Sequence, residues 1–360
     1  MNWKFYRPYR DKIVDKKNEI LSKIFDKKKK EIDIDASKIN KLLFLRVDGK
    51  IGDYIVSSFA FREIKKCYPH IQIDVIADRG LEGILKLNKY IDNYYLFNRK
   101  KNSEWKKMAK KLKGNNYDVL LDATEGLKYR QIYFLNKINA KINVGYNKDD
   151  YQIFNKKVKI SNSIKMVEIY QKMLECVNIK IDNTEYDVPV SDASEKEVNQ
   201  FLKENNVKEE DKIIALNFFG ASKLRKINSD NGIIIIKKLK ERYKNVKIIL
   251  LDSPQNRKEI YDVLHNCNNK DVLFFEKSKT ILDSISIIKR SNLVVSLDTS
   301  ILHIAEGLNK RIIAFYGPKT NKNKWRVREE GNILIDYDGI TINQINFENE
   351  LQREKLIYDL

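Results

Sequence analysis

The amino-acid sequence predicts an α/β protein of two doubly wound domains that face an interdomain cleft. Short apolar segments alternate with stretches whose apolar residues recur at helical spacing, which is the pattern of βαβ units and a parallel sheet. The alternation runs twice, and the stretch at 178–190 between the two runs is less apolar. A chain of 360 residues also exceeds the length at which a single hydrophobic core stops growing.

The first domain is predicted over residues 39–187. Five apolar segments read as its strands: Leu42–Val47, Ile71–Ala77, Tyr94–Phe97, Val119–Asp122 and Ile142–Gly145. Helical spacing separates them, for example over Tyr54–Cys67 and Trp105–Lys113. Ligands of such sheets sit beyond the carboxyl ends of the strands, so two facing domains predict one interdomain site.

The second domain is predicted over residues 188–343, after a linker that carries Asp, Asn and a proline. Its strand segments are Ile213–Asn217, Val246–Leu251, Val272–Phe275, Leu293–Ser296 and Ile312–Phe315. The last segment, 344–360, is predicted to be a closing helix, because it carries Ile345, Phe347, Leu351, Leu356 and Ile357.

The first 38 residues are predicted to form a basic, amphipathic arm. Ile13, Val14, Ile20, Leu21, Ile24 and Phe25 recur at helical spacing, a basic block follows at Lys27–Lys30, and Trp3, Phe5, Tyr6 and Tyr9 precede it. Aromatic side chains with lysines can hold a protein on an anionic membrane surface. An ordinary amphipathic helix that packs on the domain, or an arm that binds a partner, has the same pattern.

The composition bounds the class of protein. Hydrophobic residues make up 42% of the chain and charged residues 33%, which is typical of a globular protein with a heavily charged surface. The net charge of +19 would attract nucleic acid, an anionic membrane or phosphorylated substrates, and lysine-rich composition alone gives the same excess. Because no nucleic-acid-binding motif is legible, we expect no nucleic-acid partner.

Cysteine and histidine usage points to a reducing compartment without a metal centre. Cys67, Cys176 and Cys267 are far apart and odd in number, and the chain has three histidines. No apolar run has the roughly 18 residues that a transmembrane helix needs, and Met1–Arg10 lacks the apolar core of a signal peptide. We therefore expect a cytoplasmic protein.

One motif lies between the first strand and the helix near Tyr54, over Arg46–Asp53. Its glycines, Gly49 and Gly52, let the backbone approach a ligand closely. Asp53 would lie at the start of the helix, where a carboxylate either accepts a proton from an attacking hydroxyl or only caps the helix. This segment is not a GxGxxG fingerprint.

A second motif, Asp298–His303, directly follows the strand segment 293–296. Thr299 and Ser300 would lie at a helix start, where free backbone N–H groups favour a phosphate. His303 would face the same ligand one turn later, and its ring, cationic or neutral, can donate to a diphosphate oxygen. A capped helix with a partly packed histidine is the alternative.

Two further loops follow strand segments. The turn 217–222 contains Gly220 and Ser222 and is followed by Lys223, Arg225 and Lys226, so backbone N–H groups and cations could hold a phosphate there. Phe315–Pro318 contains Gly317 and is a turn signal first and a nucleotide-contact loop second.

In their order along the chain these motifs resemble glycosyltransferase family 9, the heptosyltransferases of lipopolysaccharide core assembly. The resemblance covers roughly residues 41 to 326. It rests on the first strand with Gly52-Asp53, on Cys67-Tyr68-Pro69, on Tyr117–Asp122 with Val144-Gly145-Tyr146, and on Val294–Ala305 with Phe315–Pro318.

The resemblance implies the GT-B architecture of two Rossmann-like domains, with the donor on the second domain, the acceptor on the first, and the helix at 344–360 returning to the first. It implies an inverting single displacement with no metal and no cofactor. Asp53 would be the general base. The donor diphosphate would be held by Asp298, Thr299, Ser300 and His303, together with Ser222, Arg225 and Lys226. Supporting positions would be Arg46, Gly52, Gly220, Asn256 and Gly317.

Three departures from the family pattern bear on the donor. The loop before Gly52 is about one residue longer, Arg225–Asn228 lacks an aromatic residue and a proline, and Asn256 stands where a Glu often contacts the ribose.

The sequence thus predicts transfer of a heptose from ADP-heptose to a lipopolysaccharide core or related acidic glycolipid, in the cytoplasm or at the cytoplasmic face of the inner membrane. The alternatives are a transferase of another nucleotide sugar and a non-catalytic protein that binds anions or a membrane surface.

Overall fold

The computed structural model describes residue 16 and residues 19–160, 164–220, 222–252, 256–317 and 323–353. The chain divides into two compact units, residues 1–50 with 57–184 and residues 51–56 with 185–360. The division after Thr184 lies inside the stretch 178–190 that the sequence marks as a linker.

The first unit is built on a six-stranded sheet in which all neighbouring strands are parallel. Its order is β3-β2-β1-β4-β5-β6. The strands are β1 (Lys41–Arg46), β2 (Gln72–Asp78), β3 (Asn93–Phe97), β4 (Val119–Asp122), β5 (Ile142–Tyr146) and β6 (Lys156–Val158). Its α-helices are α2 (Ile51–Cys67) from residue 57 on, α3 (Glu82–Leu85), α4 (Asn102–Leu112), α5 (Tyr129–Ile138) and α6 (Met166–Glu175). The first residues of α2, 51–56, belong to the second unit.

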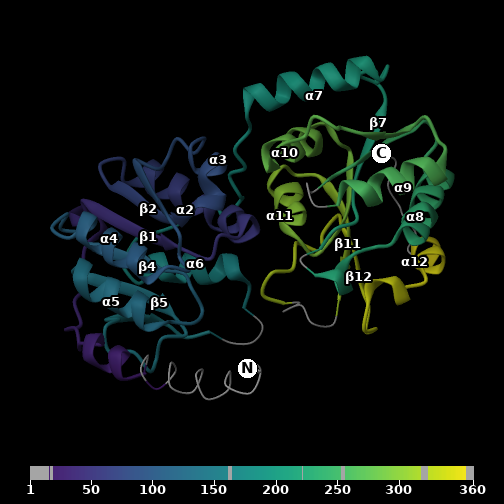
Figure 1. Ribbon diagram of the computed structural model, residues 1–360. Helices are drawn as coiled ribbons and strands as arrows, with labels where there is room; N and C mark the ends of the chain where they lie inside the picture. The colour runs from purple at the N-terminus through teal and green to yellow at the C-terminus, as the bar shows by residue number, and fades with distance from the viewer. Residues whose placement is uncertain are drawn as a thin grey trace. The chain divides into compact units, whose positions relative to one another are not determined.

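The second unit repeats this topology, with the parallel order β12-β11-β10-β7-β8-β9. Its strands are β7 (Lys212–Asn217), β8 (Val246–Leu250), β9 (Val272–Phe274), β10 (Leu293–Leu297), β11 (Arg311–Tyr316) and β12 (Ile333–Asp336). Helices α10 (Ile281–Arg290) and α11 (Ser300–Gly307) lie on one side of the sheet, and α8 (Ser229–Arg242), α9 (Arg257–Cys267) and α12 (Phe347–Arg353) on the other, while α7 (Asp192–Glu204) packs on α10 (Figure 1).

The predicted fold class is confirmed, because both sheets are doubly wound and Rossmann-like. All ten predicted strands occur, and each bound agrees within one residue. The prediction missed β6 and β12, which pair at the edges of their sheets. It also placed the start of α2 at Tyr54, whereas the helix begins at Ile51 and includes Gly52 and Asp53 in its first turn.

The closing segment packs on the second unit over its described part. Residues Ile342–Gln344 form a 3-10 turn, and α12 lies against α8. The ring of Phe347 stands 5.2 Å from that of Phe315, and Lys238 pairs with Glu348 at 2.9 Å. The predicted return to the first unit concerns a helix whose residues 354–360 lie outside the described part.

The described part of the predicted arm follows the surface of the first unit. Residues 19–25 are helical, and the ring of Phe25 packs edge-on against Tyr133 with centroids 5.0 Å apart. Asn136 and Asn155 donate side-chain hydrogen bonds to the arm carbonyls of Phe25 and Lys30, at 3.1 and 3.0 Å. Residues 1–15, 17 and 18 of the prediction lie outside the described part. Among the described helices, none combines the length and apolar character needed to cross a membrane.

Candidate functional site

The carboxyl edge of the second sheet carries a polar cluster at the point where the strand order reverses, between β7 and β10. Asn217, the last residue of β7, is buried, and its amide donates to Ser296 Oγ at 3.0 Å and Thr299 Oγ1 at 3.3 Å. The same amide donates to the carbonyl of Phe219 at 3.1 Å. Asn217 therefore fastens both loops that leave the edge, and the switch point of such a sheet is where ligands bind.

Helix α11 begins at this edge and presents its N-terminus there. Thr299 is the N-cap residue, and its hydroxyl oxygen accepts from the Ile301 N–H at 3.3 Å. Both Thr299 and Ser300 are half-buried. The dipole of the helix and the two hydroxyls make this terminus suitable for a phosphate.

The loop after β7 folds back beside that terminus. The Arg225 guanidinium bonds the carbonyl of Asp298 and pairs with its carboxylate at 3.0 Å, so this arginine joins the two loops of the switch point. A Cβ on Gly220 would lie 2.4 Å from the Arg225 carbonyl oxygen, so only glycine fits there. Ser222, whose carbonyl accepts from the Arg225 N–H at 2.9 Å, is exposed.

Lys226 reaches the start of α9, where the sequence did not point to a partner. Its ammonium donates to Asn256 Oδ1 at 3.1 Å, forms an ion pair with Glu259, and lies 5.5 Å from the centre of the Phe219 ring. Glu259 is thus a site residue that the sequence reasoning missed, three positions after the singled-out Asn256. The Lys226 pair lowers the pKa of Glu259.

His303 lies on α11 and is buried between aromatic rings. The ring centroids of Tyr186 and Trp325 stand 6.4 and 6.0 Å from its own. Burial lowers its pKa to about 4, so the imidazole is neutral near pH 7 and not the cation that the sequence left open. Its Nδ1 is buried and has no hydrogen-bond partner among the described residues.

The sequence reasoning also missed a network next to His303 that is formed by Tyr186, Glu306 and Arg328. Glu306 accepts from the Arg328 N–H at 2.8 Å and from its guanidinium at 3.2 Å. Burial, and then the neighbouring Glu306 carboxylate, raise the pKa of Tyr186. A Cβ on Gly307 would lie 2.5 Å from Val188 Cγ2, so the last part of the stretch 178–190 packs tightly on α11. Gly317 directly follows β11 and leaves room for the Tyr337 ring, because an added Cβ would lie 3.1 Å from Tyr337 Cε1.

At the carboxyl edge of the first sheet, Arg46 ends β1 and is 3% exposed. Its guanidinium pairs with Asp48 at 3.0 Å, bonds the Tyr170 hydroxyl and stacks 5.2 Å from the centre of that ring. Asp53 lies in the first turn of α2, where the N-terminus of the helix favours a negative charge. Gly52 belongs to the second unit, where a Cβ on it would lie 2.9 Å from His303 Cδ2, so this position also requires glycine.

Beside Arg46 the first sheet holds a buried ammonium and a buried carboxylate. Lys148 is fully buried and donates to the carbonyls of Thr124 and Glu125 at 2.5 and 2.9 Å. Its side chain passes over Gly145, where a Cβ would come within 2.8 Å of Lys148 Cγ, and Gly145 is the register partner of Asp122. Burial raises the pKa of Asp122, and nearby Lys148 opposes that shift.

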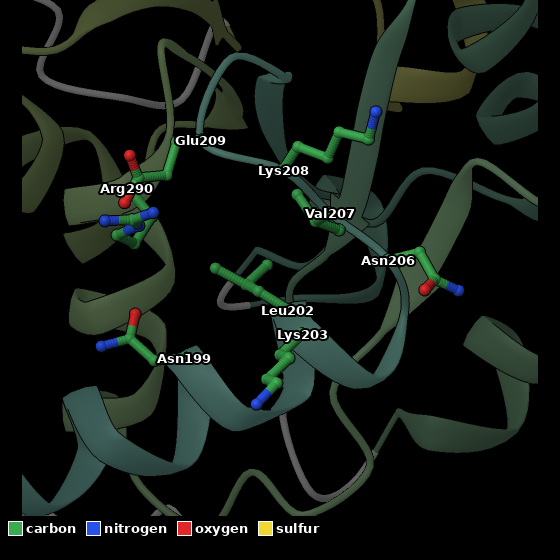
Figure 2. A pocket seen from close by; sticks show the side chains of 8 residues that line it. All are labelled: Asn199, Leu202, Lys203, Asn206, Val207, Lys208, Glu209 and Arg290. Carbon is green, nitrogen blue, oxygen red and sulfur yellow. The ribbon is translucent and has the colours of Figure 1, made fainter.

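One open pocket of the second unit lies away from this edge. Figure 2 shows side chains around it from α7, from the segment before β7 and from the end of α10: Asn199, Leu202, Lys203, Asn206, Val207, Lys208, Glu209 and Arg290. Lys208 precedes β7 and Arg290 precedes β10, so the pocket lies at the amino ends of strands whose carboxyl ends carry Asn217 and Thr299. It is not the predicted donor site. Among the described residues, no cluster of three or more His, Cys, Asp or Glu could hold a metal ion.

Two doubly wound, Rossmann-like units make up the GT-B fold. The model of glycosyltransferase family 9 (heptosyltransferase) matches residues 105–353. The chain belongs to this family and is a glycosyltransferase, which confirms the resemblance found in the sequence.

Named relatives agree with this assignment. The chain is 24% identical over 308 residues to lipopolysaccharide heptosyltransferase 1 of Campylobacter coli, which covers 79% of this chain and 88% of the relative. The fold is similar to that of a family 9 glycosyltransferase from Veillonella parvula, with TM-score 0.72, 16% identity and coverage of 86% and 88% of the two chains. For the ADP-heptose lipopolysaccharide heptosyltransferase II of Escherichia coli the TM-score is 0.69, with 16% identity and coverage of 87% and 96%.

We predict that Lys148→Met lowers the free energy of unfolding by about 3 to 5 kcal/mol, because it leaves the buried Asp122 without its nearby cation. The double variant Lys148→Met/Asp122→Asn should be less destabilised than Lys148→Met alone. Urea unfolding of the wild type, both single variants and the double variant forms the cycle. Losses that simply add would show that the two groups do not interact.

We also predict that His303 makes stability depend on pH. The folded pKa of about 4 lies below the ordinary 6.5, so the unfolded chain binds a proton first. The stability contribution is therefore complete above pH 6.5 and is lost as pH falls toward 4, by about 3 kcal/mol in all. His303→Asn should flatten unfolding free energy against pH in that window, whereas substitution of the surface residue His70 should not. Parallel curves for wild type and His303→Asn would contradict a neutral, buried imidazole.

Proposed function

We propose that the protein transfers a heptose from ADP-heptose to a lipopolysaccharide core or related acidic glycolipid acceptor, with inversion at the anomeric carbon. Membership of the heptosyltransferase family and a fold similar to a transferase named for ADP-heptose support the sugar and its carrier. The observation that carries the proposal is the N-terminus of α11, which lies at the switch point with Arg225 beside it.

In the proposed donor site, the leaving group is the nucleoside diphosphate. The positive end of the α11 dipole attracts it, and the hydroxyls of Thr299 and Ser300 donate to its oxygens. Arg225, which pairs with Asp298, and Lys226, which pairs with Glu259, supply positive charge. This charge stabilises the negative charge that develops on the diphosphate as its bond to the sugar breaks. The side-chain hydrogen bonds of Asn217 hold the two loops together.

His303 fits this role as a neutral donor. A neutral imidazole carries one N–H, and the aromatic rings on either side of it fix the plane of the ring. A neutral donor binds a diphosphate less tightly than a cation does, which helps the product to leave.

In the proposed chemical step, an acceptor hydroxyl oxygen attacks the anomeric carbon from the face opposite the diphosphate. The new C–O bond forms as the bond to the diphosphate oxygen breaks, and Asp53 takes the hydroxyl proton. The nucleoside diphosphate leaves with the electron pair of the broken bond, so charge and protons balance without any further reactant.

Asn256 and Glu259 bear on which nucleotide is carried. Both bond Lys226 at the start of α9, which places a carboxylate and an amide beside the proposed donor site. This arrangement suits a ribose and does not by itself select the base. A nucleotide sugar other than ADP-heptose is therefore the competing proposal.

We predict that the protein binds ADP more tightly than UDP or GDP, and that Thr299→Val weakens ADP binding about tenfold, because a hydrogen bond to a charged group is lost. Calorimetric titration measures both effects. Thr280→Val is the matched control, since Thr280 caps α10 as Thr299 caps α11. Preference for another nucleotide would change the proposed sugar. No binding of any nucleotide would favour a protein that binds anions without catalysis.

We further predict that Asp53→Asn slows sugar transfer by about 10² to 10⁴-fold, the usual contribution of a general base, with donor affinity unchanged. The assay is single-turnover transfer from ADP-heptose to a lipopolysaccharide core acceptor. Asp230→Asn removes a carboxylate from the first turn of α8 and controls for loss of a helix-dipole interaction alone. If both variants keep wild-type rates, Asp53 only stabilises its helix.

A further inference from the structure

The helix at residues 19–25 carries apolar side chains on two faces. Phe25 packs on Tyr133 and, like Leu21 four residues earlier, is half-buried. Ile20 and Ile24 also lie four residues apart, yet each is 55% exposed. Packing on the first unit therefore explains one apolar face of this helix and leaves the other in water.

Lysines flank the uncovered isoleucines along the same face. Lys16 and Lys23 lie at the i−4 and i+3 positions from Ile20, which is the spacing of one helical face, and Lys23 pairs there with Glu19 at 2.8 Å. Lys27 follows directly after the helix, which ends at Phe25. All three are exposed, as are Lys28 and Lys30 nearby. Lys29 differs, because its ammonium bonds the carbonyl of Ala140 and burial lowers its pKa.

The segment behind this face is firmly attached to the first unit. Asp26 accepts from the Ile153 N–H at 2.8 Å, the Lys29 N–H donates to the Gln152 carbonyl at 3.2 Å, and Lys156 pairs with Asp33 at 2.5 Å. The arm face, by which we mean Ile20, Ile24, Lys23, Lys27 and Lys28, is consequently carried by the folded unit.

We propose that the arm face docks on an anionic phospholipid surface. Isoleucines can enter the boundary between headgroups and acyl chains while flanking lysines extend toward the phosphates. Positive charge beside exposed apolar side chains is complementary to such a surface. The proposal concerns where the enzyme is held and is independent of the transfer reaction.

The test is co-sedimentation of the full chain with vesicles of phosphatidylglycerol and phosphatidylcholine, compared with phosphatidylcholine alone. We expect binding only to the anionic vesicles, and weaker binding at high salt. Ile20→Ser/Ile24→Ser should weaken it about tenfold, from the loss of two half-exposed side chains. Lys27→Glu/Lys28→Glu should weaken it about thirtyfold or more, since each lysine near the surface contributes roughly a factor of five.

Two matched controls separate the arm face from general properties of the protein. Ile340→Ser removes an isoleucine that is 74% exposed in the second unit, and Lys106→Glu/Lys110→Glu makes the same charge change on α4. Both should bind vesicles like the wild type. Equal losses in the lysine control would show that net charge alone drives binding and would overturn the proposal.

Other occupants of the arm face give different results. If the protein self-associates in light scattering and Ile20→Ser/Ile24→Ser restores the monomer, the face is an interface between copies and the lipid proposal fails. No binding to anionic vesicles would also overturn it. Calorimetric titration of ADP with the same variants keeps the two proposals distinguishable, because arm variants should leave nucleotide affinity unchanged.

Discussion

The whole structure depends on the geometry of its parallel strands. A parallel sheet requires each connection to return to the starting edge, so all carboxyl ends meet at one edge. Both sheets reverse their strand order between the first and fourth strands of the unit, which leaves that edge open at one point. In the second unit Asn217 and Arg225 occupy this point, and their hydrogen bonds hold two loops that are some 80 residues apart in sequence. The orientation of α11, and with it the phosphate-suited N-terminus, follows from those bonds.

Strong apolar periodicity made most of the fold predictable. A buried parallel strand is apolar on both faces, so segments such as Leu42–Val47 stand out from their surroundings without any alignment. The exceptions have physical reasons. β6 has three residues, two of them lysines, and β12 pairs on one side only, so neither needs a continuous apolar run. The start of α2 was placed late because Gly52 and Asp53 have low helix propensity, and context overrides propensity there.

The site residues also differ in whether the sequence alone could predict them. Thr299 and Ser300 could be found from sequence because strand, polar pair and helix follow one another locally, and helix α11 begins at that pair. Glu259 and the network of Tyr186, Glu306 and Arg328 could not, because their partners come from elsewhere in the chain. Nor could sequence decide the charge of His303. Desolvation by its surroundings makes the neutral form the stable one, and desolvation is a property of packing, not of spacing.

The positive charge of the chain illustrates why composition is weak evidence of a partner. Lys148 is buried and donates to backbone carbonyls, and Lys29 donates to the carbonyl of Ala140. Such lysines add to the net charge and offer nothing to an outside polyanion. The arm face differs because its lysines are exposed and lie on, or directly after, the helix that carries two exposed isoleucines. A lysine-rich composition produces exposed lysines everywhere, but it gives no reason for exposed isoleucines to gather among them. The joint placement of the two residue types, and not the net charge, is therefore the observation that points to a lipid surface.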